Sequence, residues 1–151
     1  MGSPTDGFIA PHGGYETLYS FQRARIVYDA TVYFTRRFFD RKDRTVDQMV
    51  QAARSGKQNI VEGSLISGTS REMEIKLTNV ARASLEELLE DYRDFLRTRG
   101  LREWQIHHAM TEEMRQLNRL PGANYETFRH LIEHPDPAVS ANAIIGLIKL
   151  T

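Results

Sequence analysis

Apolar side chains recur at spacings of three and four residues along most of this chain, and such spacing places them on one face of an α-helix. Between residues 16 and 39 the pattern predicts a first helix, which ends at a charged run beginning with Asp40. Its apolar positions are Leu18, Phe21, Ala24, Tyr28, Phe34 and Phe38. Residues 1–14 lack the periodicity and contain glycine and proline, so we expect a flexible N-terminal arm.

Two further long helices are predicted over residues 45–63 and 70–99. Thr45 begins a capping-box pattern that opens the first of them, and Gly63 ends it. Thr69 or Ser70 caps the second, which Gly100 ends. Both helices carry apolar residues at helical spacing that we expect to be buried, namely Met49, Ala53, Ile60, Leu77, Leu85 and Leu88.

Residues 100–136 are less regular, with an amphipathic helix from Glu103 to Asn118 and a short helix capped by Asn124. Asp136 followed by Pro137 is a typical helix start, so the last helix is predicted over residues 137–151. That helix is rich in apolar residues, and we expect an oligomer or further chain to cover its exposed surface. The elements predict one all-α domain over residues 15–151, an up-down four-helix bundle with a partly helical insertion between the third and last helices.

The composition is that of a single globular domain, with 151 residues of which 40% are hydrophobic and 26% charged. Because the chain contains no cysteine, disulfides and thiolate metal ligands are excluded, and a reducing compartment is expected. The longest apolar run is too short to span a bilayer. The sequence therefore predicts a cytoplasmic protein without a membrane partner.

Charge is distributed unevenly, although the formal net charge is zero. Nine basic and four acidic residues lie between Arg23 and Lys57, whereas eight acidic and four basic residues lie between Glu62 and Asp94. A bipolar surface of this kind can steer a charged partner. The candidate phosphate-binding residues are Arg36, Arg37, Arg41, Lys42, Arg44, Arg54 and Lys57. The alternative is a solvated helix end whose cations complement the helix dipole.

Two short patterns resemble catalytic motifs. His130 to His134 matches H-x-x-E-H, the inverted zinc-protease motif, but Pro135 follows at once and would end the helix at the second ligand. Arg102 and His107 match the R-x4-H pattern of metal-independent HEPN ribonucleases, which are also small helical bundles. Both matches combine common residue types, so we expect surface histidines, with no catalytic residue, metal or cofactor.

The segment from Gln48 to Gly63 resembles a motif of the four-helix-bundle proteins encoded in intervening sequences of bacterial large-subunit ribosomal RNA genes. The family pattern reads Q-x-x-R-A-A-x-S-I-P-x-N-I-A-E-G, and Lys57 replaces its usual proline. Its structural residues here are Ala52, Ala53, Ser55, Asn59, Glu62 and Gly63. The small side chains, with Gly56, would let a neighbouring helix approach closely. For Asn59 and Glu62 we expect a buried polar network between the second and third helices, or alternatively a ligand site.

The resemblance extends over residues 15–100, including Ser70 and the run from Val80 to Leu88, with Ala83 where glycine is common. The rest is similar to a branch called the four-helix-bundle suffix domain. Relatives include the accessory variability proteins of diversity-generating retroelements, which form basic pentamers and bind nucleic acid and a reverse transcriptase.

The resemblance and the residues together lead us to expect a non-enzymatic accessory protein. It would form a homo-oligomer, a pentamer by resemblance, and bind RNA, DNA or a ribonucleoprotein partner such as a reverse transcriptase. The alternatives are a protein-interaction scaffold without a nucleic-acid role and, third, a small metal-independent ribonuclease.

Overall fold

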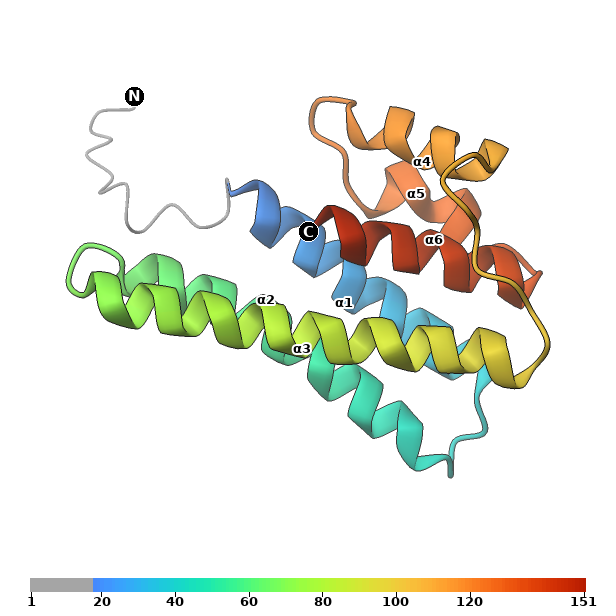
Figure 1. Ribbon diagram of the computed structural model, residues 1–151, viewed down its shortest axis with the longest axis horizontal. Coiled ribbons are helices and arrows are strands. Elements are labelled where there is room, and N and C mark those ends of the chain that lie inside the picture. Colours follow the sequence, from blue (N-terminus) through green and yellow to red (C-terminus); the bar gives the residue numbers. More distant parts are fainter. Residues whose placement is uncertain (1–17) are drawn as a thin grey trace.

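The computed structural model describes residues 18–151, which form six helices and no strand (Figure 1). The helices are α1 (Tyr19–Phe38), α2 (Arg44–Ile66), α3 (Arg71–Thr98), α4 (Ala109–Asn118), α5 (Tyr125–Ile132) and α6 (Pro137–Leu150). The predicted all-α class is therefore confirmed for these residues. The expected arm over residues 1–14 and the first residues of the predicted first helix lie outside the described part. None of the helices described is both long enough and apolar enough to cross a bilayer.

Local capping signals locate several helix ends correctly. Ser70 accepts a hydrogen bond from the Met73 N–H at the start of α3 (3.1 Å), and Asp136 accepts one from Ala138 at the start of α6 (2.9 Å). Gly100 ends α3 with a backbone φ of +70°, a left-handed conformation that glycine adopts without strain. These contacts satisfy backbone groups that a helix end leaves without intrahelical partners.

The ends of α2 differ from the prediction. Asp43, not Thr45, is the N-cap, because its side chain accepts a hydrogen bond from the Thr45 N–H (2.9 Å). At the other end the helix continues through Gly63 to Ile66. Gly63 is buried against α3, where a Cβ would lie 3.6 Å from that of Leu77. Packing against α3 thus keeps this glycine inside the helix rather than at its end.

The predicted helix from Glu103 begins only at Ala109. The Trp104 backbone N–H donates to the Asn142 Oδ1 of α6 (2.7 Å), which holds the preceding segment in a non-helical path along that helix. The Trp104 ring also stacks on His108, with ring centroids 5.0 Å apart. His108 then caps α4 by accepting from the Met110 N–H (3.1 Å). A tertiary contact therefore overrides the helical pattern of residues 103–108.

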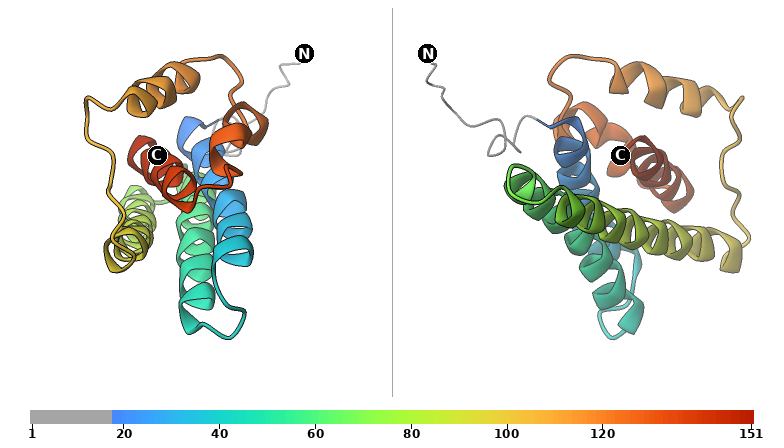
Figure 2. Two further views of the ribbon diagram at one scale, coloured as in Figure 1. Left: turned by 90° about the vertical axis from the view of Figure 1, so that its right-hand side faces the viewer. Right: turned by 60° about the vertical axis from the view of Figure 1, so that its left-hand side comes forward.

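The helices pack around α6. The helices α2 and α3 form an antiparallel hairpin with the most extensive contact in the molecule, and α1 packs against α2. The last helix contacts α1 and α3 on one side and α4 and α5 on the other (Figures 1 and 2). The segment between α3 and α6 is consequently a covering layer over α6.

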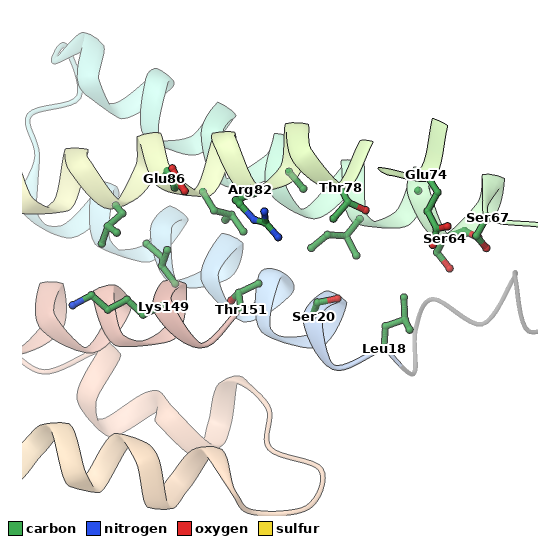
Figure 3. Close-up of a pocket in the computed structure, with 16 residues that line it drawn as sticks. Leu18, Ser20, Ser64, Ser67, Glu74, Thr78, Arg82, Glu86, Lys149 and Thr151 are labelled. Carbon is green, nitrogen blue, oxygen red and sulfur yellow. The ribbon is translucent and has the colours of Figure 1, made fainter. Parts of the chain in front are cut away.

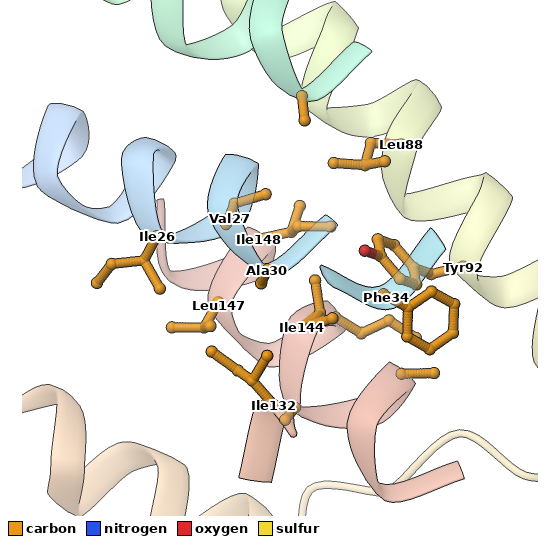
Figure 4. Packing of buried hydrophobic residues seen from close by; sticks show 14 of the residues in the cluster. Ile26, Val27, Ala30, Phe34, Leu88, Tyr92, Ile132, Ile144, Leu147 and Ile148 are labelled. Atoms are coloured by element: carbon orange, nitrogen blue, oxygen red, sulfur yellow. The ribbon is translucent and has the colours of Figure 1, made fainter. Parts of the chain in front are cut away.

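This covering layer explains why another prediction, the one about the last helix, is wrong. The expected exposed apolar surface of the last helix does not occur, because Ile144, Ile145, Leu147 and Ile148 are all buried. Figure 4 shows Ile144, Leu147 and Ile148 packed with Val27 and Phe34 of α1 and with Leu88 and Tyr92 of α3. A helix that is apolar nearly all round is stable only when neighbours surround it. Its apolar character therefore reflects its place within the domain.

Most residues expected in the core are buried there. Met49, Ala53, Leu85 and Leu88 are buried as predicted, whereas Ile60 and Leu77 are only half-buried. These two lie toward the end of the hairpin that joins α2 to α3. At about 1.5 Å per residue, α6 spans roughly half the length of α3. It therefore does not extend to the half of the hairpin nearest the α2–α3 loop.

Candidate nucleic-acid interface

A short turn between α1 and α2 gathers five of the seven basic residues singled out from the sequence. Arg36 and Arg37 lie in the last turn of α1, Arg41 and Lys42 lie in the turn, and Arg44 is the first residue of α2. All five side chains are exposed. The turn projects from the rest of the molecule (Figure 2). A compact, accessible group of cations thus forms at one end of the bundle.

The acidic residues of this turn are bound to backbone N–H groups. Asp40 accepts from the Lys42 N–H (2.8 Å), and Asp43 accepts from the Thr45 N–H (2.9 Å). The backbone hydrogen bond from Thr45 lowers the pKa of the Asp43 carboxyl. Among residues 18–151, no carboxylate lies within 4 Å of the cationic groups of Arg36, Arg37, Arg41, Lys42 or Arg44, as the ion pairs there involve other bases. The cations therefore remain available to an anionic partner.

Arg99 is a sixth base at this end, and it is absent from the candidates that the sequence pattern indicates. It is the C-cap of α3, and its guanidinium lies 3.8 Å from the centroid of the Phe95 ring and 5.5 Å from that of Phe39. The Arg99 charge also helps to lower the pKa of Asp43, after the hydrogen bonds from Thr45. Three successive antiparallel helices bring the end of the third beside the end of the first, which is the signal that would have predicted Arg99.

Arg54 and Lys57 do not belong to this group. They follow Arg44 by ten and thirteen residues, which corresponds to roughly 15 and 20 Å along α2. The Lys57 ammonium lies 4.8 Å from the centroid of the Tyr28 ring of α1. We define the basic turn by Arg36, Arg37, Arg41, Lys42, Arg44 and Arg99.

The motif residues of α2 form the contact with α3. Ala52, Ala53 and Gly63 are buried. The Ser55 hydroxyl lies 2.8 Å from the Ser84 hydroxyl of α3, and the Asn59 amide donates to the Ser55 carbonyl (2.8 Å) and hydroxyl (3.1 Å). The side chains of Ser55, Asn59 and Ser84 are half-buried, whereas Glu62 is exposed.

The residues of the first pattern that resembles a catalytic motif, His130 to His134, form hydrogen bonds with other protein groups. His130 lies 2.8 Å from the Glu113 carboxylate, Glu133 accepts from the Tyr125 hydroxyl (2.7 Å), and His134 accepts from the Asp136 N–H (3.0 Å). No three His, Cys, Asp or Glu side chains in residues 18–151 are grouped so as to hold a metal.

The second pattern, Arg102 and His107, lies in the non-helical segment between α3 and α4, and both residues are exposed. The pattern therefore does not place the two side chains on one helix.

A cleft of about 580 Å³ lies beyond the C-terminal end of α6, between α1 and the hairpin (Figure 3). Ile60, Ala81, Leu85 and Ile148 supply its apolar wall, and Arg82 lies at its polar edge. The volume is within the range of small-molecule sites. The cleft thus lies where α1, the hairpin and the end of α6 meet.

Comparisons with known proteins give no match, whether to a family model, a curated protein or a solved structure. Arguments about function therefore depend on the geometry of this chain.

Proposed function

We propose that the protein is a non-enzymatic, homo-oligomeric accessory that binds nucleic acid through the basic turn. The observation that carries the proposal concerns the exposed bases of the turn. In residues 18–151 none of Arg36, Arg37, Arg41, Lys42 and Arg44 forms an ion pair, and the neighbouring carboxylates are held by backbone N–H groups. Phosphates of RNA or DNA are the partners that such a group of arginines would recognise. We also propose that the protein belongs to the intervening-sequence family. In that proposal α1, α2, α3 and α6 form an up-down bundle.

The test is fluorescence anisotropy of labelled single- and double-stranded RNA and DNA over a series of salt concentrations. Arg41→Glu with Arg44→Glu should abolish binding at low salt while the helical circular-dichroism signal is unchanged. For the wild type, the logarithm of affinity should fall against the logarithm of salt with a slope of about 0.7–0.9 per phosphate contact.

A matched control changes the same charge elsewhere. Arg82→Glu with Arg119→Glu alters two exposed arginines away from the basic turn, so its affinity should fall much less than that of the turn variant. If the wild type binds no nucleic acid at low salt, or if both double variants lose binding equally, the proposal is wrong.

A protein-interaction scaffold is the second candidate. The observation that favours it is exposed apolar surface on the hairpin, where Leu65, Met73, Ile75 and Val80 are each at least 40% exposed. Such surface is typical of a protein-binding face when it is contiguous. If the wild-type protein binds no nucleic acid, a protein-interaction scaffold is the function that remains.

A further inference from the structure

In the part of the chain that the structure describes, the hairpin has an outer face that no other helix covers. We define it by Met73, Val80, Glu87 and Asp91 of α3, with Gln51 of α2 beside them. The α3 residues lie seven, seven and four positions apart, so they share one stripe of the helix. Glu87, Asp91 and Gln51 line a shallow hollow of about 660 Å³ between the two helices. The outer face is thus apolar near the α2–α3 loop and acidic toward the C-terminal end of α3.

The acidic part lacks cationic partners. No ion pair in residues 18–151 involves Glu87 or Asp91. Burial raises the pKa of Asp91, and the neighbouring charges of Asp94, Glu87 and Glu90 raise it further. A cation placed in the hollow would relieve this repulsion.

The basic turn has the opposite properties. It projects from the bundle, as Figures 1 and 2 show, and within residues 18–151 its cations form no ion pair with a carboxylate. Half-buried Phe38 and Phe39 add apolar surface beside the charges. A protruding surface that is basic and partly apolar therefore complements a hollow surface that is acidic and partly apolar. Both belong to one chain whose net charge is zero.

We propose that the basic turn of one copy docks on the outer face of a second copy. The inference rests on the oligomeric part of the proposed function and names the contact that would build the oligomer. Two different surfaces meet, so the contact either forms twice in a two-fold dimer or repeats head-to-tail into a ring or a filament. Like charges repel when two turns or two acidic hollows meet, which sets the orientation.

A consequence is competition between the second copy and nucleic acid. Both partners use the cations of the basic turn, so binding of one excludes the other at the same turn. Addition of nucleic acid should therefore dissociate the assembly into smaller species.

The experiment is charge reversal with rescue by mixing. The turn variant carries Arg41→Glu with Arg44→Glu, and the face variant carries Glu87→Lys with Asp91→Lys. Light scattering at low salt should give each variant alone as a monomer of 17.4 kDa, while the wild type forms larger species. An equal mixture should regain the larger species, because each reversed surface then meets an oppositely charged partner.

A milder variant protects the test against misfolding. Glu87→Gln with Asp91→Asn removes the charges without reversing them, and should lower the salt concentration at which the wild-type assembly dissociates. Circular dichroism shows whether each variant is helical. The proposed contact is wrong if the wild type is a monomer, or if the turn variant or the face variant assembles on its own. It is also wrong if a mixture of the two folded variants stays monomeric.

The two proposals fail in different ways. The face variant retains the basic turn, so it should still bind nucleic acid although it no longer assembles. Assembly with rescue but no nucleic-acid binding contradicts only the nucleic-acid function. Nucleic-acid binding by a protein that stays monomeric contradicts the docking contact and the oligomeric part of the proposed function, but not the nucleic-acid function.

Discussion

Gly56 lies where α2 packs tightly against Leu85 of α3, and its substitution tests this packing directly. A Cβ added to Gly56 would lie 2.7 Å from Cδ2 and 2.8 Å from Cγ of Leu85. Leu85 is only 8% exposed, so its side chain has little room to move away. Gly63, also buried in α2, has its nearest such contact at 3.6 Å, an ordinary van der Waals distance. The two glycines therefore differ in the space available for a methyl group.

The expected magnitudes follow from two opposing effects. Replacing glycine by alanine inside a helix stabilises it by about 0.8–1 kcal/mol. Overpacking a close contact costs about 1–3 kcal/mol. Gly63→Ala should therefore raise the free energy of unfolding by up to about 1 kcal/mol, whereas Gly56→Ala should leave it unchanged or lower it by up to about 2 kcal/mol. Gly56→Leu, with three more carbons to place, should destabilise further.

Urea unfolding followed by circular dichroism measures both variants. A double-mutant cycle with Leu85→Ala isolates the contact, because truncation of Leu85 removes the atoms that the new Cβ would meet. In that background Gly56→Ala should stabilise the protein, as Gly63→Ala does in the wild type. Equal stability changes for the two glycine variants in the wild-type background would refute the close approach of α2 and α3.

Two further predictions concern polar contacts that hold the covering layer and α6 in place. Arg23 is 3% exposed and donates to the side chain and carbonyl of Asn118, so Arg23→Met should cost about 1–3 kcal/mol and speed amide hydrogen exchange near residue 118. Burial of Glu103 opposes its ionisation, but hydrogen bonds from Arg93 and Lys149 outweigh this and lower its pKa below the ordinary 4.5. Its contribution to stability is therefore complete above about pH 5 and declines as pH falls through the lowered pKa. Glu103→Gln should flatten the acid side of a plot of urea midpoint against pH, and an unchanged acid limb would contradict the reasoning.

Much of the helical pattern could be predicted because its causes are local. Ser70, Asn124 and Asp136 satisfy backbone N–H groups within three residues, and Gly100 supplies a positive φ. These signals depend on a few neighbouring residues, and a sequence displays them directly.

The errors arise where distant residues determine the local structure. The helix predicted from residue 103 begins six residues later because Asn142, in another helix, binds the Trp104 backbone. The apolar α6 was expected to need an outside partner, yet residues of α4 and α5 cover it. Periodicity shows that a face is apolar but does not show which element covers it.

The candidate site shows the same division. The run from Arg36 to Arg44 is visible as a basic cluster in the sequence, but the sequence does not show what its acidic residues bind. Only the fold shows that Asp40 and Asp43 bind backbone N–H groups. Arg99 joins through the packing of α3 beside α1, a contact that its sequence neighbours do not reveal.

The alternative explanation of the basic turn, cations that complement helix dipoles, accounts for only part of it. Arg36 and Arg37 lie in the last turn of α1, where a positive charge is stabilising. Arg44 is the first residue of α2, where the dipole disfavours a cation by about 0.3–1 kcal/mol. Replacing Arg44 by glutamate should therefore favour the helix. Weakening of α2 then does not explain a loss of nucleic-acid binding in the Arg41→Glu, Arg44→Glu variant. The face variant, which retains the basic turn but does not assemble, separates loss of the phosphate contact from loss of assembly.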